Sequence, residues 1–145
     1  MIREVEKDRV VMGRLPHGGD LLEELTKICR ERDIRLGKVT AVGAVQRACI
    51  SYYNQATKEY EQTTLEEPME ISSLLGNVSL HEGRPMVHAH VNLVREDGSV
   101  VGGHLEEGTQ IFAAEAVIEA FKGEEFQRSF DGVTGLPLWA QKRGQ

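Results

Sequence analysis

Apolar and polar residues alternate along much of this chain, and a period of two predicts β-strands. Residues 36–53 illustrate the pattern, because Val39, Ala41 and Val45 alternate with their neighbours, and two strands are expected there. Residues 60–65 suit a short edge strand. Further strands are expected at residues 5–14, 69–80 and 126–130, the last followed by the turn residues Gly132, Gly135 and Pro137. The alternation predicts a molecule built mainly of sheet.

In residues 21–29, by contrast, the apolar residues recur with the period of a helix. These residues form one stripe on a helix, namely Leu21, Leu22, Leu25, Ile28 and Cys29. Asp20 precedes this stripe and can cap the helix, and Glu23 completes the spacing of a capping box. Several strands with one firm helix favour a mixed α+β fold, in which the helix packs on the sheet.

Residues 109–121 are compatible with both a helix and a strand. Ala and Glu favour a helix by intrinsic propensity. The same residues also alternate as they would in a strand with one apolar face. The two alternating sets are Phe112, Ala114, Ala116, Ile118 and Ala120 on one side, and Ile111, Ala113, Glu115, Val117 and Glu119 on the other. The pattern alone leaves helix and strand open.

Three histidines stand in a pattern that suggests a metal site. His88 and His90 lie two residues apart on an expected strand, so their side chains project from the same side. The intervening residues form an apolar row that faces the core, and His104 follows on the return strand of a hairpin. Three neutral imidazoles with one open position are typical of catalytic zinc. A His-x-His pair on a half-exposed strand is also compatible with an ordinary polar face.

The register of this hairpin decides whether the third imidazole joins the other two. A two-residue turn would place His104 opposite Val91 and direct its ring into the core. A three-residue loop over residues 96–98, with its glycine at positive φ, places His104 opposite His90. A bulge at residues 102–103 would have the same effect. The site hypothesis therefore predicts one of these two features.

Composition narrows the class of protein. A chain of 145 residues is long enough for one domain with a real core, so residues 1–145 are expected to form a single domain. The net charge of −6 and the scattered Lys and Arg argue against wrapping of nucleic acid, because phosphate binding depends on clustered cations.

No apolar run is long enough to cross a bilayer, and residues 1–8 lack a secretion signal, so a cytoplasmic protein with no membrane partner is expected. Cys29 and Cys49 are expected to be reduced core residues.

A set of short motifs from about residue 10 to residue 138 matches a known domain. These motifs are Gly43-Ala44-Val45, Met69-Glu70-Ile71, Gly76-Asn77, His88-Ala89-His90, Gly98, Val101-Gly102-Gly103-His104-Leu105, Glu115 and Arg128. Gly-Gly-His-Leu after a His-x-His strand is a more specific combination than either part. The chain thus resembles the domain conserved between plants and prokaryotes, the PPC domain, and residues 10–138 correspond to its core.

This resemblance implies a fold, an assembly and a cofactor. The family implies an α/β fold on an antiparallel sheet, so residues 109–121 are expected to be a strand, and its members usually form homotrimers. Members that keep the three histidines look like metal proteins, which implies zinc, or another divalent transition metal, at His88, His90 and His104. The fold is also similar to that of acetolactate decarboxylase, which holds zinc with three histidines in a comparable arrangement.

DNA is a partner that the family label implies. Plant members join the domain to an AT-hook, a basic motif centred on Arg-Gly-Arg-Pro that enters the minor groove. This chain has only Gly83-Arg84-Pro85, and His81-Glu82 stand before it where a hook has cations that hold phosphates. These residues therefore add no support for DNA binding.

Two functions stay open at this point. The first is a metal-dependent lyase or hydrolase acting on a small polar metabolite, with Glu106 and Glu115 as candidate catalytic carboxylates. Glu106 would fall opposite His88 in the expected register. Glu115 interrupts an apolar strand, so its carboxylate is expected either to have a functional role or to form an ion pair, with Arg128 or with a neighbouring subunit. The second is a structural or regulatory platform with no reaction of its own.

Two arginines are candidates for recognising an anionic group. Arg47 and Arg128 could each hold a carboxylate or phosphate, although single arginines are more often surface residues. The sequence as a whole predicts a PPC-type homotrimer with a three-histidine metal site and no identified activity.

Overall fold

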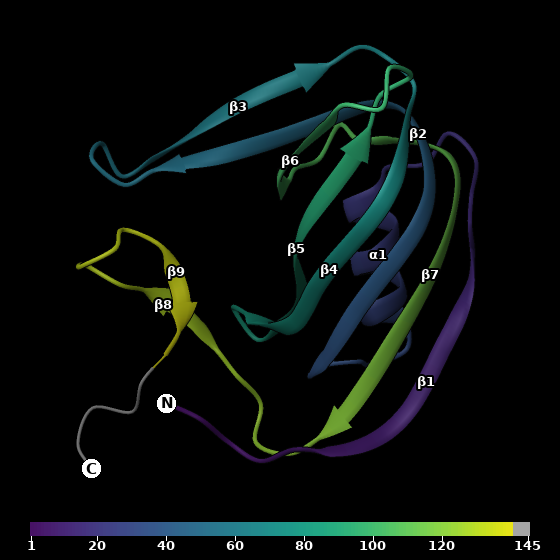
Figure 1. The fold of residues 1–145 in the computed structure, drawn as a ribbon. Coiled ribbons are helices and arrows are strands. Elements are labelled where there is room, and N and C mark those ends of the chain that lie inside the picture. The colour runs from purple at the N-terminus through teal and green to yellow at the C-terminus, as the bar shows by residue number, and fades with distance from the viewer. Residues whose placement is uncertain (141–145) are drawn as a thin grey trace.

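The computed structural model describes residues 1–140, which fold into one large antiparallel sheet, a helix and a small hairpin (Figure 1). The elements are β1 (Glu6–Leu15), α1 (Leu21–Glu31), β2 (Gly37–Asn54), β3 (Glu59–Leu65), β4 (Met69–His81), β5 (Arg84–Val94), β6 (Val100–Leu105), β7 (Gln110–Lys122), β8 (Arg128–Phe130) and β9 (Pro137–Trp139). The large sheet has the order β1-β7-β2-β4-β5-β6, and β3 pairs with β2. The predicted α+β class, with a mostly antiparallel sheet and one main helix, is confirmed.

The helix begins where the capping residues predict. The Asp20 side chain accepts a hydrogen bond from the Glu23 backbone N–H at 2.9 Å, and a second one from the Gly108 N–H at 2.6 Å. Leu21, Leu25 and Cys29 are fully buried against the sheet. The one helix found in residues 1–140 has 11 residues, fewer than a membrane-crossing helix requires.

The segment that fitted both periods is a strand, β7, as the resemblance implied. One of its side chains breaks the predicted alternation, because Phe112 is exposed while its neighbour Ile111 is completely buried. The cause is a bulge: Ala44 of β2 pairs with Ala113, but the next residue, Val45, pairs with Ile111. Phe112 is left without a partner in the ladder, and the assignment of faces reverses beyond it.

β2 is one long bent strand, so the expectation of two strands over residues 36–53 is wrong. Its pairing with β4 and β7 shifts near Gly43, whose φ is 143°. A Cβ at Gly43 would lie 2.1 Å from the Ala113 carbonyl oxygen, so only glycine allows this approach. After the bend, the second half of β2 pairs with β3 and also with β6, at Ile50–Leu105 and Ser51–His104. The bend thereby brings β6 next to β2.

The C-terminal hairpin stands beside the large sheet. β8 is shorter than the expected strand, and Pro137, which was expected in a turn, is the first residue of β9. The hairpin follows a segment held to β4 by a hydrogen bond from the Leu80 N–H to the Phe126 carbonyl oxygen, at 2.8 Å. The arm formed by β2 and β3 extends above the hairpin (Figure 1), and the Tyr53 hydroxyl donates to the Thr134 carbonyl oxygen at 2.6 Å. The arm and the hairpin are therefore in direct contact.

Candidate metal centre

The β5–β6 hairpin has the register that the site hypothesis requires. The Gly98 N–H donates to the Arg95 carbonyl oxygen at 2.9 Å, and the Arg95 N–H donates to the Ser99 carbonyl oxygen, also at 2.9 Å. Gly98 has a φ of 81°, as a three-residue loop predicts. The ladder runs without a shift from Val94–Val100 to His90–His104, so β6 has no bulge at residues 102–103. The predicted turn is confirmed.

The three imidazoles meet on the side of β5 and β6 that faces away from the core. The ring centres of His88 and His104 lie 4.9 Å apart, those of His88 and His90 5.2 Å, and those of His90 and His104 5.5 Å. One nitrogen from each ring can be chosen so that all three lie within 4.8 Å of one another. His88 and His104 are half-buried, whereas His90 is exposed. The cluster is therefore open on one side.

The surroundings of His88 and His104 favour the neutral form of these two rings. The pKa of His88 is lowered to about 4, mainly by burial and to a smaller extent by the positive charge of Arg128 and by the two neighbouring imidazoles. Burial also lowers the pKa of His104, although the Glu106 carboxylate acts in the opposite direction. An uncharged ring with a free lone pair is the form that binds a metal ion.

The unpaired nitrogen of His104 indicates that this cluster fits a metal. His104 Nδ1 is buried and has no hydrogen-bond partner among residues 1–140. A buried polar atom without a partner is costly and rare, and a bound ion would satisfy it. Three imidazoles suit zinc, copper, nickel or iron, whereas magnesium and calcium prefer oxygen ligands. The donor set therefore fits a transition metal.

Tyr60 covers one side of the cluster and was missed in the sequence. Its ring centre lies 5.0 Å from that of His104 and 5.0 Å from that of Tyr53. Burial raises the pKa of Tyr60, as do the charges of Glu106 and Tyr53, while Arg128 lowers it. The only sequence signal was one aromatic residue in an otherwise polar edge strand, which does not indicate its partner.

Arg128 enters the cluster from β8. Its Nε donates to Ser79 Oγ at 2.9 Å, its Nη2 to Asn77 Oδ1 at 3.0 Å, and its Nη1 to the Pro137 carbonyl oxygen at 3.0 Å. Nη2 also lies 3.5 Å from His88 Nδ1. Burial lowers the pKa of Arg128, and Tyr60 opposes this shift. The guanidinium is thus held directly beside the first histidine.

Glu106 lies near the cluster, but not at the predicted place. The β5–β6 ladder ends at His90–His104, so Glu106 does not pair with His88 as expected. Instead its backbone N–H donates to the Cys49 carbonyl oxygen at 3.0 Å, because β6 leaves β5 and follows β2. The Glu106 carboxylate accepts a hydrogen bond from Ser51 Oγ at 2.6 Å.

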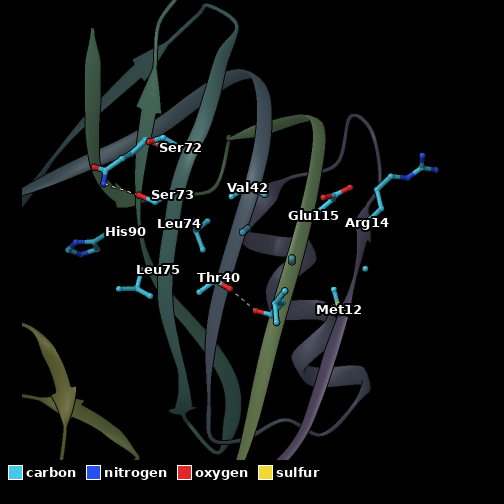
Figure 2. A pocket seen from close by; sticks show the side chains of 15 residues that line it. Met12, Arg14, Thr40, Val42, Ser72, Ser73, Leu74, Leu75, His90 and Glu115 are labelled. Atoms are coloured by element: carbon cyan, nitrogen blue, oxygen red, sulfur yellow. Dashed lines mark hydrogen bonds between the residues drawn. The ribbon is translucent and has the colours of Figure 1, made fainter. Parts of the chain in front are cut away.

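Glu115 lies far from the three histidines within the same chain. It is on β7, where it pairs with Arg14 of β1 and Val42 of β2, and two strands separate β7 from β5. Three steps between neighbouring strands correspond to roughly 14 Å. Figure 2 shows Glu115 and His90 at opposite sides of the same view. The expected ion pair between Glu115 and Arg128 does not occur within residues 1–140.

The second candidate arginine is also separate from the cluster. Arg47 forms an ion pair with Glu66 at 3.3 Å, between Nη2 and Oε1. Its Nε is buried without a hydrogen-bond partner among the residues that the structure describes. The structure therefore brings Arg128 to the histidines, and not Arg47.

An apolar surface runs from His90 across the sheet. This outer sheet face includes the exposed side chains of Met12, Val42 and Leu75, with exposed fractions of 75%, 52% and 60%. Together with His90 they line a shallow hollow of about 880 Å³ (Figure 2). The exposed imidazole of the cluster thus lies at the border of a large apolar surface.

Comparison with known proteins points to one family. The family model of the Plants and Prokaryotes Conserved (PCC) domain, the domain also abbreviated PPC, matches residues 2–122. The fold is similar to that of a metal-containing protein of Archaeoglobus fulgidus, with 40% identity, a TM-score of 0.93, and coverage of 97% of this chain and 99% of that one. It is similar to a PPC protein of Pyrococcus horikoshii, with 35% identity, a TM-score of 0.91, and coverage of 99% of both chains.

Two further relatives have functional descriptions that differ from those of the first two. A proposed DNA-binding protein of Bacteroides thetaiotaomicron has 27% identity and a TM-score of 0.84, over 94% of this chain and 96% of that one. The bifunctional protein GlmU of Synechococcus sp. is 34% identical over 137 residues, which are 92% of this chain but 21% of that protein. The chain therefore spans about a fifth of the length of this curated relative.

Proposed function

Because this chain belongs to the Plants and Prokaryotes Conserved domain family, we propose that it is a homotrimeric metalloprotein with a zinc-type ion at His88, His90 and His104. The observation that carries the proposal is the convergence of three imidazoles, one of which has a buried nitrogen without a partner. The metal-containing relative from Archaeoglobus fulgidus supports it, since it shares 40% of its residues with this chain. A three-histidine zinc ion supplies Lewis acidity and an open position for water or a substrate oxygen.

The outer sheet face supports association into an oligomer. Met12 on β1, Val42 on β2 and Leu75 on β4 expose apolar side chains on the same face of the sheet and line one hollow. Contiguous apolar surface of this kind often marks a contact with another protein. We propose that copies of this chain meet through this surface, and the homotrimer implied by the family resemblance is the expected assembly.

A second candidate function is a metal-dependent lyase or hydrolase acting on a small polar metabolite. The observation that favours it is the exposure of His90, together with a hollow of about 360 Å³ lined by His88 and Arg128. Pockets of this size accept small molecules. Glu106, whose carboxylate acts on His104 but does not line this hollow, is the base proposed for the metal site, and Glu115 could take part only at the site of another subunit.

DNA binding is not favoured by these observations. The description of the Bacteroides relative raises it, but this chain has a net charge of −6. Affinity for phosphates needs clustered cations. Five of the arginines pair with nearby carboxylates, namely Arg3, Arg9, Arg35, Arg47 and Arg95. We expect no shift of a duplex DNA probe at moderate salt, and a clear shift would favour the family label instead.

Metal analysis tests the main proposal. The protein would be purified without chelator, its mass in solution measured by light scattering, and its metal content measured by mass spectrometry. We expect a trimer with about one transition metal ion per chain, and loss of that metal in His104→Ala. His81→Ala is the matched control, since His81 is exposed at the far end of β4 and outside the cluster. Full metal content in His104→Ala, or none in the wild type, would overturn the proposal.

A further inference from the structure

Arg128 is a half-buried cation without an anionic partner in residues 1–140. Its three hydrogen bonds all go to neutral acceptors, namely a serine hydroxyl, an asparagine carbonyl and a backbone carbonyl. Partly buried charges are normally paired, because burial without a partner is costly. The other arginines half-buried near this end of the fold do have acidic partners: Arg3 with Glu124, and Arg35 with Glu125. Arg128 is therefore unusual among its neighbours.

The guanidinium also has donors to spare. It carries five N–H groups, and the three bonds use one on each nitrogen. One N–H on Nη1 and one on Nη2 remain, and Nη2 lies 3.5 Å from His88 Nδ1. A nitrogen that carries a hydrogen cannot also accept one, so this contact satisfies Arg128 only when Nδ1 is the unprotonated nitrogen of the ring. The spare donor on Nη2 is therefore close to His88.

The space beside these donors is accessible to a small molecule. Arg128 and His88 both line the hollow of about 360 Å³, whose other walls include Asn77, Leu138 and Trp139. Apolar walls on one side and a guanidinium on the other resemble the usual lining of a small-ligand pocket, in which a few polar groups fix orientation. Among residues 1–140, no acidic side chain lines this hollow.

Charge balance indicates what kind of molecule would enter. A divalent ion held by His88 would add positive charge close to a guanidinium that already lacks a partner. The Glu106 carboxylate, whose charge acts on His104, is hydrogen-bonded to Ser51. Two neighbouring cations of this kind strongly favour an anion between them.

We propose that Arg128 binds the oxyanion group of a small ligand, a carboxylate or a phosphate, that enters the hollow beside His88 and reaches the metal's open position. The metal contact rests on the proposed function, whereas the contact with Arg128 does not. A purely structural role is the alternative, because the hydrogen bonds of Arg128 to Asn77 and Ser79 tie the C-terminal hairpin to β4.

Calorimetric titration with two probes tests the proposal. Pyruvate and inorganic phosphate would be titrated separately into the full-length protein, both zinc-loaded and stripped of metal, and the stronger binder identifies the type of oxyanion. Replacing Arg128 with methionine should weaken binding of that probe at least roughly tenfold, as expected for loss of a charge-assisted hydrogen bond. Arg84→Met is the matched control, because Arg84 is exposed at the far end of β5. It should leave the affinity and the zinc content unchanged.

A second measurement covers the case in which Arg128→Met does not fold. In wild-type protein with ¹⁵N-labelled arginine, the Arg128 Nε–H signal, assigned with Arg128→Lys, should move when the probe is added. Equal affinity in wild type and Arg128→Met, an Arg128 signal that does not move, or failure of both probes to bind would overturn the inference. Wild-type protein that binds no zinc but loses probe affinity on replacement of Arg128 would overturn the proposed metal site and leave the oxyanion site standing.

Discussion

Replacing Gly76 by alanine tests how closely the strands must approach to form the histidine cluster. Gly76 lies on β4 opposite Ala89, between the residues that pair with His88 and His90. A Cβ at this position would lie 2.6 Å from the His88 carbonyl oxygen and 2.8 Å from Ala89 Cβ. Two carbon atoms in contact are normally about 3.5 Å apart, so β4 and β5 would have to separate by roughly 0.7 Å.

The expected cost follows from that separation. Both contacts are made by the backbone of β5 or by atoms fixed to it, so no flexible side chain can absorb the strain. Overpacking of this kind costs about 1–3 kcal/mol of folding free energy. Metal–ligand distances tolerate only about 0.2 Å, so a shift of His88 should also weaken zinc binding by roughly tenfold or more.

Two assays separate these effects. Urea denaturation of the metal-free protein measures the stability change, and competition with a zinc-binding dye measures affinity in the folded protein. Gly13→Ala on β1 is the matched control, because nothing lies within 4 Å of the added methyl group. Unchanged zinc affinity and stability in Gly76→Ala would refute the claim that close packing of β4 on β5 positions the site.

Three further predictions concern the fold. Leu25→Ala should lower the free energy of unfolding by about 2–5 kcal/mol in urea denaturation, because Leu25 is fully buried between helix and sheet; a loss below 1 kcal/mol would contradict its core role. Asp20→Ala should cost about 1–2 kcal/mol, since it removes the cap of α1 and the bond to the Gly108 N–H, and Asp20→Asn should restore part of it; equal loss in both variants would contradict the capping account. Burial raises the pKa of Cys29 from 9.0 to about 12, so the unfolded state loses its proton first and stability should fall as the pH rises from 9 towards 12. Cys29→Ala should flatten that decline, and an unchanged pH profile in the variant would argue against this cause.

The turn that joins the histidines could be predicted because its information is local. A two-residue turn, a three-residue loop and a bulge each fix the position of His104 by counting along the strand, and the site hypothesis selected between them. The information for α1 is also local, because its cap and apolar stripe lie within 10 residues of one another. Short-range geometry therefore predicted the helix, and it reduced the register of the histidine hairpin to a few alternatives.

The bends of the sheet could not be predicted from the pattern. The shift near Gly43 exists because the Ala113 carbonyl oxygen approaches from β7, about half the chain away. The bulge at Phe112 exposes a large apolar side chain that its hydrophobicity alone would predict to be buried. Both features depend on a neighbouring strand that alternation does not identify, so two strands were expected where one bent strand occurs.

For a related reason, the sequence did not reveal which side chains from other strands surround the three histidines. Tyr60 and Arg128 come from β3 and β8, which belong to the arm and the C-terminal hairpin. Each reaches the histidines through long-range packing, by a ring contact with His104 and a hydrogen-bonding side chain beside His88. Periodicity reports which face a residue occupies, but not which residues share that face from other strands. Strand order likewise separates Glu115 from the histidines of the same chain, which the alternation along β7 does not reveal.

Anomalous diffraction at the zinc edge tests the central claim most directly. Crystals would be grown without chelator and without added metal, and data would be collected on both sides of the edge. The account predicts one anomalous peak per chain between the rings of His88, His90 and His104, absent in crystals of His104→Ala. Rings that converge with no peak between them, or a peak at another place in the chain, would contradict it.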